Sequence, residues 1–376
     1  TFGTNLTSIG QDAFETCNTL TNLVLPDSVT SIGSYAFANC LEIANLTLGK
    51  GLVSLGASAF QSCANVPAVI LPESLTDTGS SVFAGDTMLT NVTFGSNLNS
   101  VGNSAFADCS RLLAATLPDN VTSIGNNAFQ NCSSLVHFTI PNTVTSLGSY
   151  AFAGDGSLQN VAIPNSITSI GSYAFDHCEE FSSITIPDSV TNIGDNAFSW
   201  CLDVNSLTIG TNVVSIGTNA FMFDQHFASV TIPGSVTSLG SYAFEYCFAL
   251  TSVYFLGNAP NADSSVFQHP DVSGPLPTVY YLPGAFGWDI PTLGGAFVEP
   301  WLPQIQNDSS FGVQNNQFGF NLNWASGQTV VVEACTNLSN PVWLPLQTNT
   351  LNGGPVYFSD PQWTNYPGRF YQLSSQ

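Results

Sequence analysis

Apolar residues recur along this chain in blocks that repeat every 23 residues, and phenylalanine marks the interval without a single insertion. The twelve positions are Phe14, Phe37, Phe60, Phe83, Phe106, Phe129, Phe152, Phe175, Phe198, Phe221, Phe244 and Phe267. A fixed period of about 20 to 50 residues indicates one supersecondary unit stacked on copies of itself. The pattern therefore predicts a solenoid, whose function depends on a long repetitive surface.

The apolar positions within one repeat predict short strands and a turn. Leu23 and Leu25 alternate across Val24, which places both leucines on one face of a strand. Pro26 ends that strand because proline has no N–H to donate to a ladder. A second extended segment follows and ends at Gly33, and glycine occupies the corresponding position in eleven repeats, which predicts a positive φ there. The Ala-Phe pair is then expected to point inward from a short helical or irregular turn.

Aligned on phenylalanine, the repeat is L-x-x-L-x-L-P-x-S-V-T-S-I-G-x-x-A-F-x-x-C. It resembles the BspA-like (Treponema-type) bacterial leucine-rich repeat, and the resemblance covers about residues 1–283. This resemblance implies a curved right-handed solenoid on a secreted or surface-attached protein, associated with adhesion and with binding of protein or matrix. The fold class expected is thus a repeat solenoid followed by a small all-β domain.

The 23-residue period ends near residue 303. Val279–Pro283 is expected to be a closing strand after a Pro- and Gly-rich insertion at 269–277, and residues 284–302 to be a linker. Five alternating segments then predict a small β-sandwich at 303–376: Phe318–Trp324, Thr329–Ala334, Val342–Gln347, Val356–Ser359 and Arg369–Leu373. Its motifs, which include Asp360-Pro361 and Arg369-Phe370-Tyr371, resemble a C-terminal module of secreted proteins from environmental bacteria.

Charge excludes two classes of partner. The chain has three cationic residues, Lys50, Arg111 and Arg369, against 25 Asp and Glu, which gives a net charge of −22. Nucleic acids and anionic membranes both require clustered Lys or Arg. No apolar run reaches the roughly 18 residues of a membrane span. We therefore expect an acidic extracellular or cell-surface protein that contacts neither nucleic acid nor the membrane interior.

One further position of the repeat, three residues after the phenylalanine, is occupied by cysteine or aspartate, and both residue types have simple structural interpretations there. Eight cysteines follow the phenylalanine by three residues, but coils about 4.8 Å apart are badly spaced for disulfides, so free buried thiols are expected. Asp86, Asp155 and Asp224 replace cysteine in three repeats, and each is predicted to accept N–H bonds of a turn. The four histidines are scattered over different repeats and no nucleophile motif is present, so we predict neither an enzyme nor a cofactor or metal site.

The exposed strand face is the first candidate binding surface. Threonine occupies its central position in seven of eleven repeats, with asparagine or serine beside it. The candidate residues are Asn45, Thr47, Asn91, Thr93, Thr116, Thr139, Thr185, Thr208 and Thr231. Such a ladder suits a glycan or matrix polymer, or an ice or mineral surface, although threonine is also an ordinary exposed strand residue.

The two ends of the solenoid are the second candidate. Phe2-Gly3 aligns with Leu25-Pro26, so the chain starts inside a repeat, and an uncapped coil exposes apolar side chains and strand edges. The leading hypothesis is a structural or adhesive protein that assembles head to tail, which generates filaments when the contacts do not close. The interface would join Phe2 and Phe14 of one copy either to the C-terminal β-domain or to the aromatic residues Tyr280, Tyr281, Trp288 and Trp301 of the next. The alternative is a monomeric adhesin that uses its Thr/Asn face.

Overall fold

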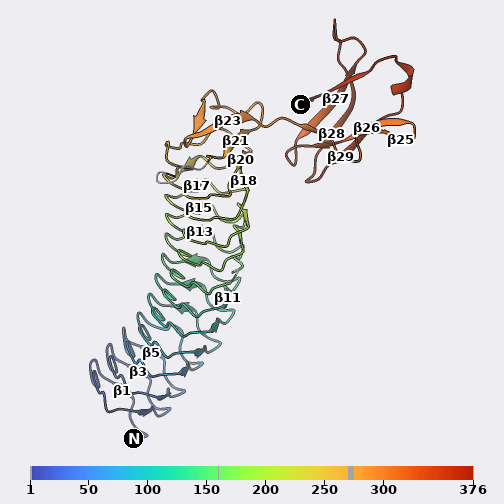
Figure 1. Cartoon of the computed structure of the whole chain (residues 1–376). Coiled ribbons are helices and arrows are strands. Elements are labelled where there is room, and N and C mark those ends of the chain that lie inside the picture. Colours follow the sequence, from blue (N-terminus) through green and yellow to red (C-terminus); the bar gives the residue numbers. More distant parts are fainter. Residues whose placement is uncertain (1, 160, 270–274, 376) are drawn as a thin grey trace. The chain divides into compact units, whose positions relative to one another are not determined.

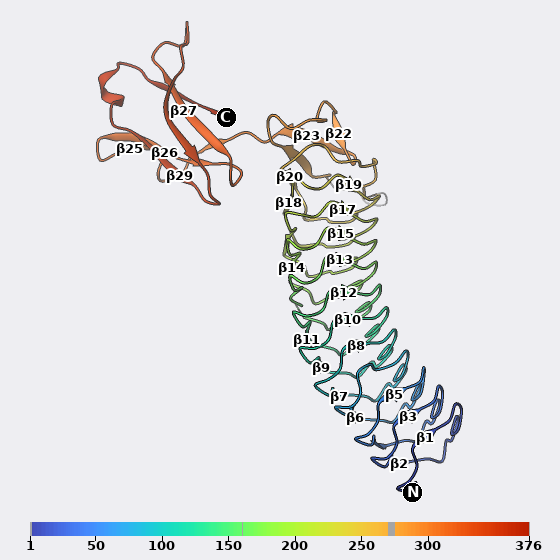
Figure 2. The ribbon, with the colours of Figure 1, turned by 180° about the vertical axis from the view of Figure 1, so that it is seen from behind.

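The computed structural model describes residues 2–159, 161–269 and 275–375, and it divides into two compact units. Unit 1 comprises Thr1–Val279 and Phe286–Val298, and unit 2 comprises Tyr280–Ala285 and Glu299–Gln376. Unit 1 is a β-solenoid of about twelve coils, coloured from blue at its first coil to orange at Phe286–Val298 in Figures 1 and 2. The predicted fold class is confirmed.

Most coils of unit 1 contribute two short strands, one to each of two columns, while Asp77 and Asn261 join the second column through isolated bridges. The first column contains β2 (Asn22–Val24), β4 (Asn45–Thr47), β6 (Ala68–Ile70), β7 (Asn91–Thr93), β9 (Ala114–Thr116), β11 (His137–Thr139), β14 (Ser183–Thr185), β16 (Ser206–Thr208), β18 (Ser229–Ile232) and β20 (Ser252–Phe255). The second contains β1 (Ser8–Ile9), β3 (Ser31–Ile32), β5 (Ser54–Leu55), β8 (Ser100–Val101), β10 (Ser123–Ile124), β12 (Ser146–Leu147), β13 (Ser169–Ile170), β15 (Asn192–Ile193), β17 (Ser215–Ile216) and β19 (Ser238–Leu239).

Neighbouring coils pair in parallel with a register of one repeat. Ser183 of β14 pairs with Ser206 of β16, and Thr185 with Thr208, so equivalent residues of successive repeats lie side by side. The alternation predicted from the sequence is present, because Leu23 and Leu25 are 0% and 3% exposed while Val24 between them is 50% exposed. One strand face is therefore core and the other is solvent surface.

The repeat phenylalanines form one continuous stack of rings through the core of unit 1. Consecutive Phe rings are stacked with centroids 5.2 to 5.7 Å apart and planes within 20° of parallel. Burial of one such side chain contributes about 2–3 kcal/mol. The segment that carries each Phe is a turn, and its backbone also bonds to the next coil: Phe37 N–H donates to the Ala59 carbonyl at 2.8 Å.

The repeated glycine has a different role from the one predicted. Among its eleven positions only Gly79 has a positive φ, so the expectation of a left-handed turn is wrong for the others. A Cβ on Gly148 would lie 2.4 Å from the Asn126 nitrogen of the preceding coil, and Gly33 and Gly240 meet the same obstacle. Glycine is required because the backbones of neighbouring coils are in direct contact at this position, which leaves no space for a Cβ atom. The left-handed positions instead lie two residues before and two residues after the phenylalanine, and most of them hold side chains.

The predicted cysteine arrangement is confirmed, since all nine cysteines are free. Each thiol that follows a repeat phenylalanine, from Cys40 onward, donates to the carbonyl oxygen of the phenylalanine one coil earlier. In Cys132 the Sγ lies 3.2 Å from the Phe106 oxygen. Burial raises the pKa of this thiol well above its ordinary value. These cysteines are small buried donors, not reactive groups.

After β20 the chain forms β21 (Thr278–Tyr281), β22 (Thr292–Leu293) and β23 (Ala296–Pro300). They extend the last parallel pair into a five-stranded sheet in the order β18-β20-β21-β23-β22, and the division between the two units runs through β21 and β23. The range predicted as a linker, 284–302, thus contains two strands. Residues 270–274 of the insertion predicted at 269–277 lie outside the described residues.

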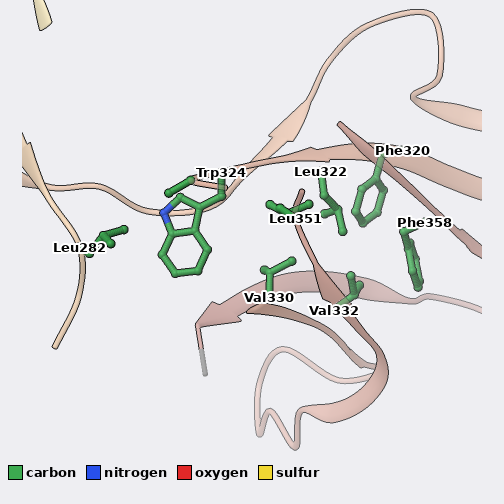
Figure 3. Packing of buried hydrophobic residues seen from close by; sticks show 9 residues of the cluster. Leu282, Phe320, Leu322, Trp324, Val330, Val332, Leu351 and Phe358 are labelled. Carbon is green, nitrogen blue, oxygen red and sulfur yellow. The ribbon is translucent and has the colours of Figure 1, made fainter. Parts of the chain in front are cut away.

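Unit 2 consists of two antiparallel sheets. In one, β26 (Gln317–Asn323) pairs with β24 (Gln304–Gln306), β25 (Gly312–Gln314) and β29 (Val356–Asp360). In the other, β27 (Thr329–Cys335) lies between β28 (Leu344–Thr350) and β30 (Phe370–Ser375), and η1 (Trp363–Asn365) precedes β30. Phe320 and Leu322 of β26, Phe358 of β29, and Val330 and Val332 of β27 form the shared core (Figure 3). Four predicted strands are present at nearly the expected residues, and the strand expected at Val342–Gln347 begins two residues later, at Leu344.

Candidate functional site

The nine predicted strand-face residues are all exposed and stand on one column of strands. Thr116 and Thr139 are side by side on β9 and β11, and Thr185 and Thr208 on β14 and β16. The strand spacing places their side chains about 4.8 Å apart. Four of the same positions carry other residues, Val24, Ile70, Ala162 and Tyr254, so the threonine ladder has interruptions.

The second threonine column has a structural role. Thr30 Oγ1 lies 3.1 Å from the Thr7 carbonyl oxygen of the preceding coil, and Thr191 and Thr237 repeat this contact. The serine of the P-x-S motif, two residues before this threonine, makes a similar bond: Ser189 Oγ donates to the Ile167 carbonyl oxygen at 2.7 Å. These hydroxyls bond to carbonyl groups of the preceding coil, although Thr30, Thr191 and Thr237 are themselves exposed.

Two shallow hollows lie on the strand face near the C-terminal end of the solenoid. One, of about 350 Å³, is lined by residues that include Thr208, Ser229 and Thr231. The other, of about 300 Å³, is lined by residues that include Ala162, Ser183 and Thr185. Ligand pockets in proteins are about 300–1,000 Å³ and are lined mainly by apolar groups with a few polar ones. Small residues such as Ala162 and the hydroxyl side chains beside it create open, mixed surfaces of this kind.

The aromatic residues predicted at the assembly interface have partners within the chain. Phe2 meets Phe14 edge to face with centroids 5.5 Å apart, and both are partly exposed. Trp288 is only 5% exposed, contacts Phe255 and donates its Nε1–H to the Gly257 oxygen at 3.1 Å.

The other three belong to unit 2. The Trp301 N–H donates to the Tyr281 oxygen at 2.6 Å, and Tyr280 and Tyr281 are half-buried. A role of these residues in assembly stays a prediction.

Sequence reasoning missed a second surface of unit 1, at the position two residues after the repeat phenylalanine. In five consecutive coils this position carries a partly exposed ring, and we call the set the aromatic ladder: His177, Trp200, Phe223, Tyr246 and His269. Successive centroids are 5.3, 4.0, 4.4 and 6.0 Å apart, with planes within 24° of parallel. The 23-residue spacing of these aromatic residues was the signal that would have found them.

The column of the aromatic ladder is small and polar in earlier coils, where it holds Thr16, Asn39, Ser62, Gly85, Asp108, Asn131 and Gly154. The backbone is left-handed at each position of this column from Thr16 to Tyr246: φ is 59° at Asn131 and 61° at Trp200. Asparagine and glycine adopt this conformation readily, and bulky side chains rarely do. Stacking between neighbouring rings offsets the cost, at about 0.5–1.5 kcal/mol for each pair.

The three aspartates in the cysteine column are fully buried. Asp86 Oδ1 accepts the Cys63 N–H at 2.7 Å and Asp224 Oδ1 the Cys201 N–H at 3.2 Å, which confirms the predicted bond to a turn N–H for these two. Burial raises the pKa of Asp86, Asp155 and Asp224 well above the ordinary value of an aspartate. Among the described residues no group of three or more His, Cys, Asp or Glu is arranged to hold a metal ion.

The family model described as the BspA type leucine rich repeat region matches residues 1–113, 111–166 and 145–272. The chain belongs to this family. No curated protein matches the chain. No helix in the described part of the chain is long and apolar enough to cross a membrane.

Solved structures of other leucine-rich repeat proteins share this fold. A leucine-rich repeat protein from Bacteroides ovatus superposes with a TM-score of 0.58 at 22% identity, over 78% of this chain and 87% of its own. The pneumococcal vaccine antigen PcpA superposes with a TM-score of 0.52 at 19% identity, over 74% of this chain and 80% of its own. At these identities the likeness establishes the BspA-type solenoid fold alone.

Proposed function

We propose that this BspA-type chain is a non-catalytic extracellular adhesion protein that binds a glycan or matrix polymer through its strand face. The observation that carries the proposal is the in-register column of exposed threonine and serine, which contains two shallow hollows at Ser183–Thr185 and Thr208–Thr231. An extended polymer with a regular repeat can contact several coils at once, so weak contacts add along its length. Hydroxyl groups recognise such polymers by hydrogen bonds without requiring charge.

The family and the electrostatics support an extracellular location. PcpA, which has a similar solenoid, is a pneumococcal vaccine antigen, and a vaccine antigen must be accessible from outside the cell. A net charge of −22 with three cationic residues leaves a surface of uncharged polar groups and carboxylates. Such a surface disfavours nucleic acid and anionic membranes and leaves neutral polymers as suitable partners.

The test is binding of the purified chain to immobilised glycans and matrix proteins, with two matched triple variants. Thr185→Ala/Thr208→Ala/Thr231→Ala removes the hydroxyls at the hollows, and Thr47→Ala/Thr93→Ala/Thr116→Ala removes three from the same column elsewhere. We expect the first to weaken binding about tenfold or more and the second to change it little. Equal binding by both variants and the unmodified chain, or no binding to any glycan or matrix protein, would overturn the proposal.

Head-to-tail assembly is the second candidate. Successive coils pair in one register, as Ser8 does with Ser31 and Ser31 with Ser54, and in this assembly a coil of a second copy would pack on Phe2 and Phe14 in the same way. Electron microscopy at several salt concentrations distinguishes the two candidates. Filaments that lengthen as salt screens the −22 charge would support assembly, and single particles under all conditions would exclude it.

A further inference from the structure

The aromatic ladder presents ring edges to solvent beside a group of carboxylates. Adjacent rings cover each other's faces, since the closest pair, Trp200 and Phe223, has centroids only 4.0 Å apart. Phe248, 43% exposed, lies against Tyr246 and His269 and widens the apolar surface. The surface is therefore a stripe of aromatic rims that runs along the stacked coils, and it is separate from the strand face.

One acidic side chain contacts this stripe at its N-terminal end: Glu179 lies 3.8 Å from Nδ1 of His177, the first ring of the ladder. A second, Asp203, follows Trp200 of the ladder by three residues and lies 3.9 Å from Nε2 of His226, which is not part of the ladder. Both carboxylates are exposed, as is Glu180. The chain has no Lys or Arg between Arg111 and Arg369, so no fixed positive charge within the repeats of the ladder offsets these groups.

The edge-exposed rings of the aromatic ladder favour some classes of ligand over others. A sugar ring stacks on an aromatic face, and the faces in this ladder are covered by neighbouring rings. Ring rims carry partial positive charge, so a cationic head does not bind them directly. Lysine and arginine have long aliphatic stems that cover apolar surface while the charged head lies elsewhere. If the aliphatic part of a Lys or Arg side chain packed on the ring edges of Trp200 and Phe223, its charged group would be free to bind the carboxylate of Glu179 or Asp203.

We propose that the aromatic ladder, together with Glu179 and Asp203, is a docking surface for a basic polypeptide segment. Charge complementarity identifies this partner: a chain of net charge −22 attracts cations, and at the ladder the exposed carboxylate of Glu179 adjoins a continuous apolar stripe. The strand-face function and this one use different residues and different chemistry, so each can fail alone.

The first experiment measures binding of an oligoarginine peptide to the full chain at physiological ionic strength. In Trp200→Asn/Phe223→Asn/Tyr246→Asn the ladder receives the residue that earlier coils hold at Asn39 and Asn131, which suits the left-handed backbone. We expect affinity to fall about tenfold or more. Trp200→Phe/Tyr246→Phe keeps the rings and should bind like the unmodified chain. Circular dichroism establishes that each variant is folded.

The second experiment separates the local site from general charge attraction. Glu179→Gln/Asp203→Asn and Glu42→Gln/Asp119→Asn remove two exposed carboxylates each, so they change net charge equally. We expect the first pair to weaken binding several-fold more than the second and to reduce its salt dependence. Equal effects of the two pairs, unchanged binding in the asparagine ladder variant, or no measurable binding of the peptide would overturn the proposal.

Discussion

The two units of this protein are stabilised in opposite ways. In unit 1 each contact is repeated in coil after coil, so the Phe14–Phe37 stack and the Phe221–Phe244 stack are nearly identical, at 5.2 and 5.3 Å. In unit 2 key contacts occur once. Asp360 is 4% exposed and forms an ion pair with Arg369, whose Nε lies 2.9 Å from Asp360 Oδ2. Asp360 also accepts a hydrogen bond from the Tyr371 hydroxyl at 2.9 Å, and Arg369 lies over the Tyr366 ring.

The stability of unit 1 is therefore distributed over many equivalent Phe stacks, whereas that of unit 2 depends strongly on one network of a few side chains. The Asp360–Arg369–Tyr371 network also explains the Asp-Pro and Arg-Phe-Tyr motifs of the C-terminal sequence, which come together only on β29 and β30. Burial raises the pKa of the Tyr371 hydroxyl, and its hydrogen bond to the Asp360 carboxylate raises it further.

The largest expected effect tests the repetition. Phe129→Ala should destabilise unit 1 by about 3–5 kcal/mol, because it leaves a cavity between two fully buried rings. Phe198→Ala, three coils further on, should cost nearly the same, as measured by chemical denaturation. A difference of several kcal/mol between the two variants would mean that the coils are not energetically equivalent.

Loss of the unique network should have a similar but local effect. Arg369→Ala leaves Asp360 buried without its ion pair and is expected to cost about 3–5 kcal/mol. Hydrogen exchange should show the loss in unit 2 while protection in unit 1 is unchanged. Arg111→Ala removes an exposed cation as a control, and a similar loss in that variant would refute the special role of Arg369.

The repeated glycine should be the next most sensitive position. Gly148→Ala introduces a Cβ 2.4 Å from the Asn126 nitrogen, so the two coils must separate locally, at a cost of about 2–3 kcal/mol. Gly10→Ala, where no atom lies within 4 Å, is its matched control. Thermal unfolding of the two variants measures the difference, and equal melting temperatures would show that backbone proximity is not the reason for glycine.

The buried aspartates predict a smaller, pH-dependent effect. Their folded-state pKa is raised by burial above the unfolded value near 4, so their stabilising contribution is complete below that pH and is lost as pH rises through the folded pKa. Unit 1 should therefore melt at a higher temperature in mild acid than at neutral pH. Asp86→Asn/Asp155→Asn/Asp224→Asn should flatten this profile, and the exposed control Asp119→Asn should not. A steep profile that persists in the triple variant would exclude these carboxyls as its cause.

Sequence determined the solenoid of this protein because an exact 23-residue period leaves one in-register way to stack equivalent residues. It also identified the inward leucines, the free thiols and the exposed threonines, since each depends on position within one coil. Only the tertiary structure showed why Gly148 is glycine and which hydroxyls are used internally, because both depend on the distance to the next coil. Two further features also required the tertiary structure. The rings of the aromatic ladder are 23 residues apart and become neighbours only when the coils stack. Asp360 and Arg369 are nine residues apart and form an ion pair only in the folded β-domain.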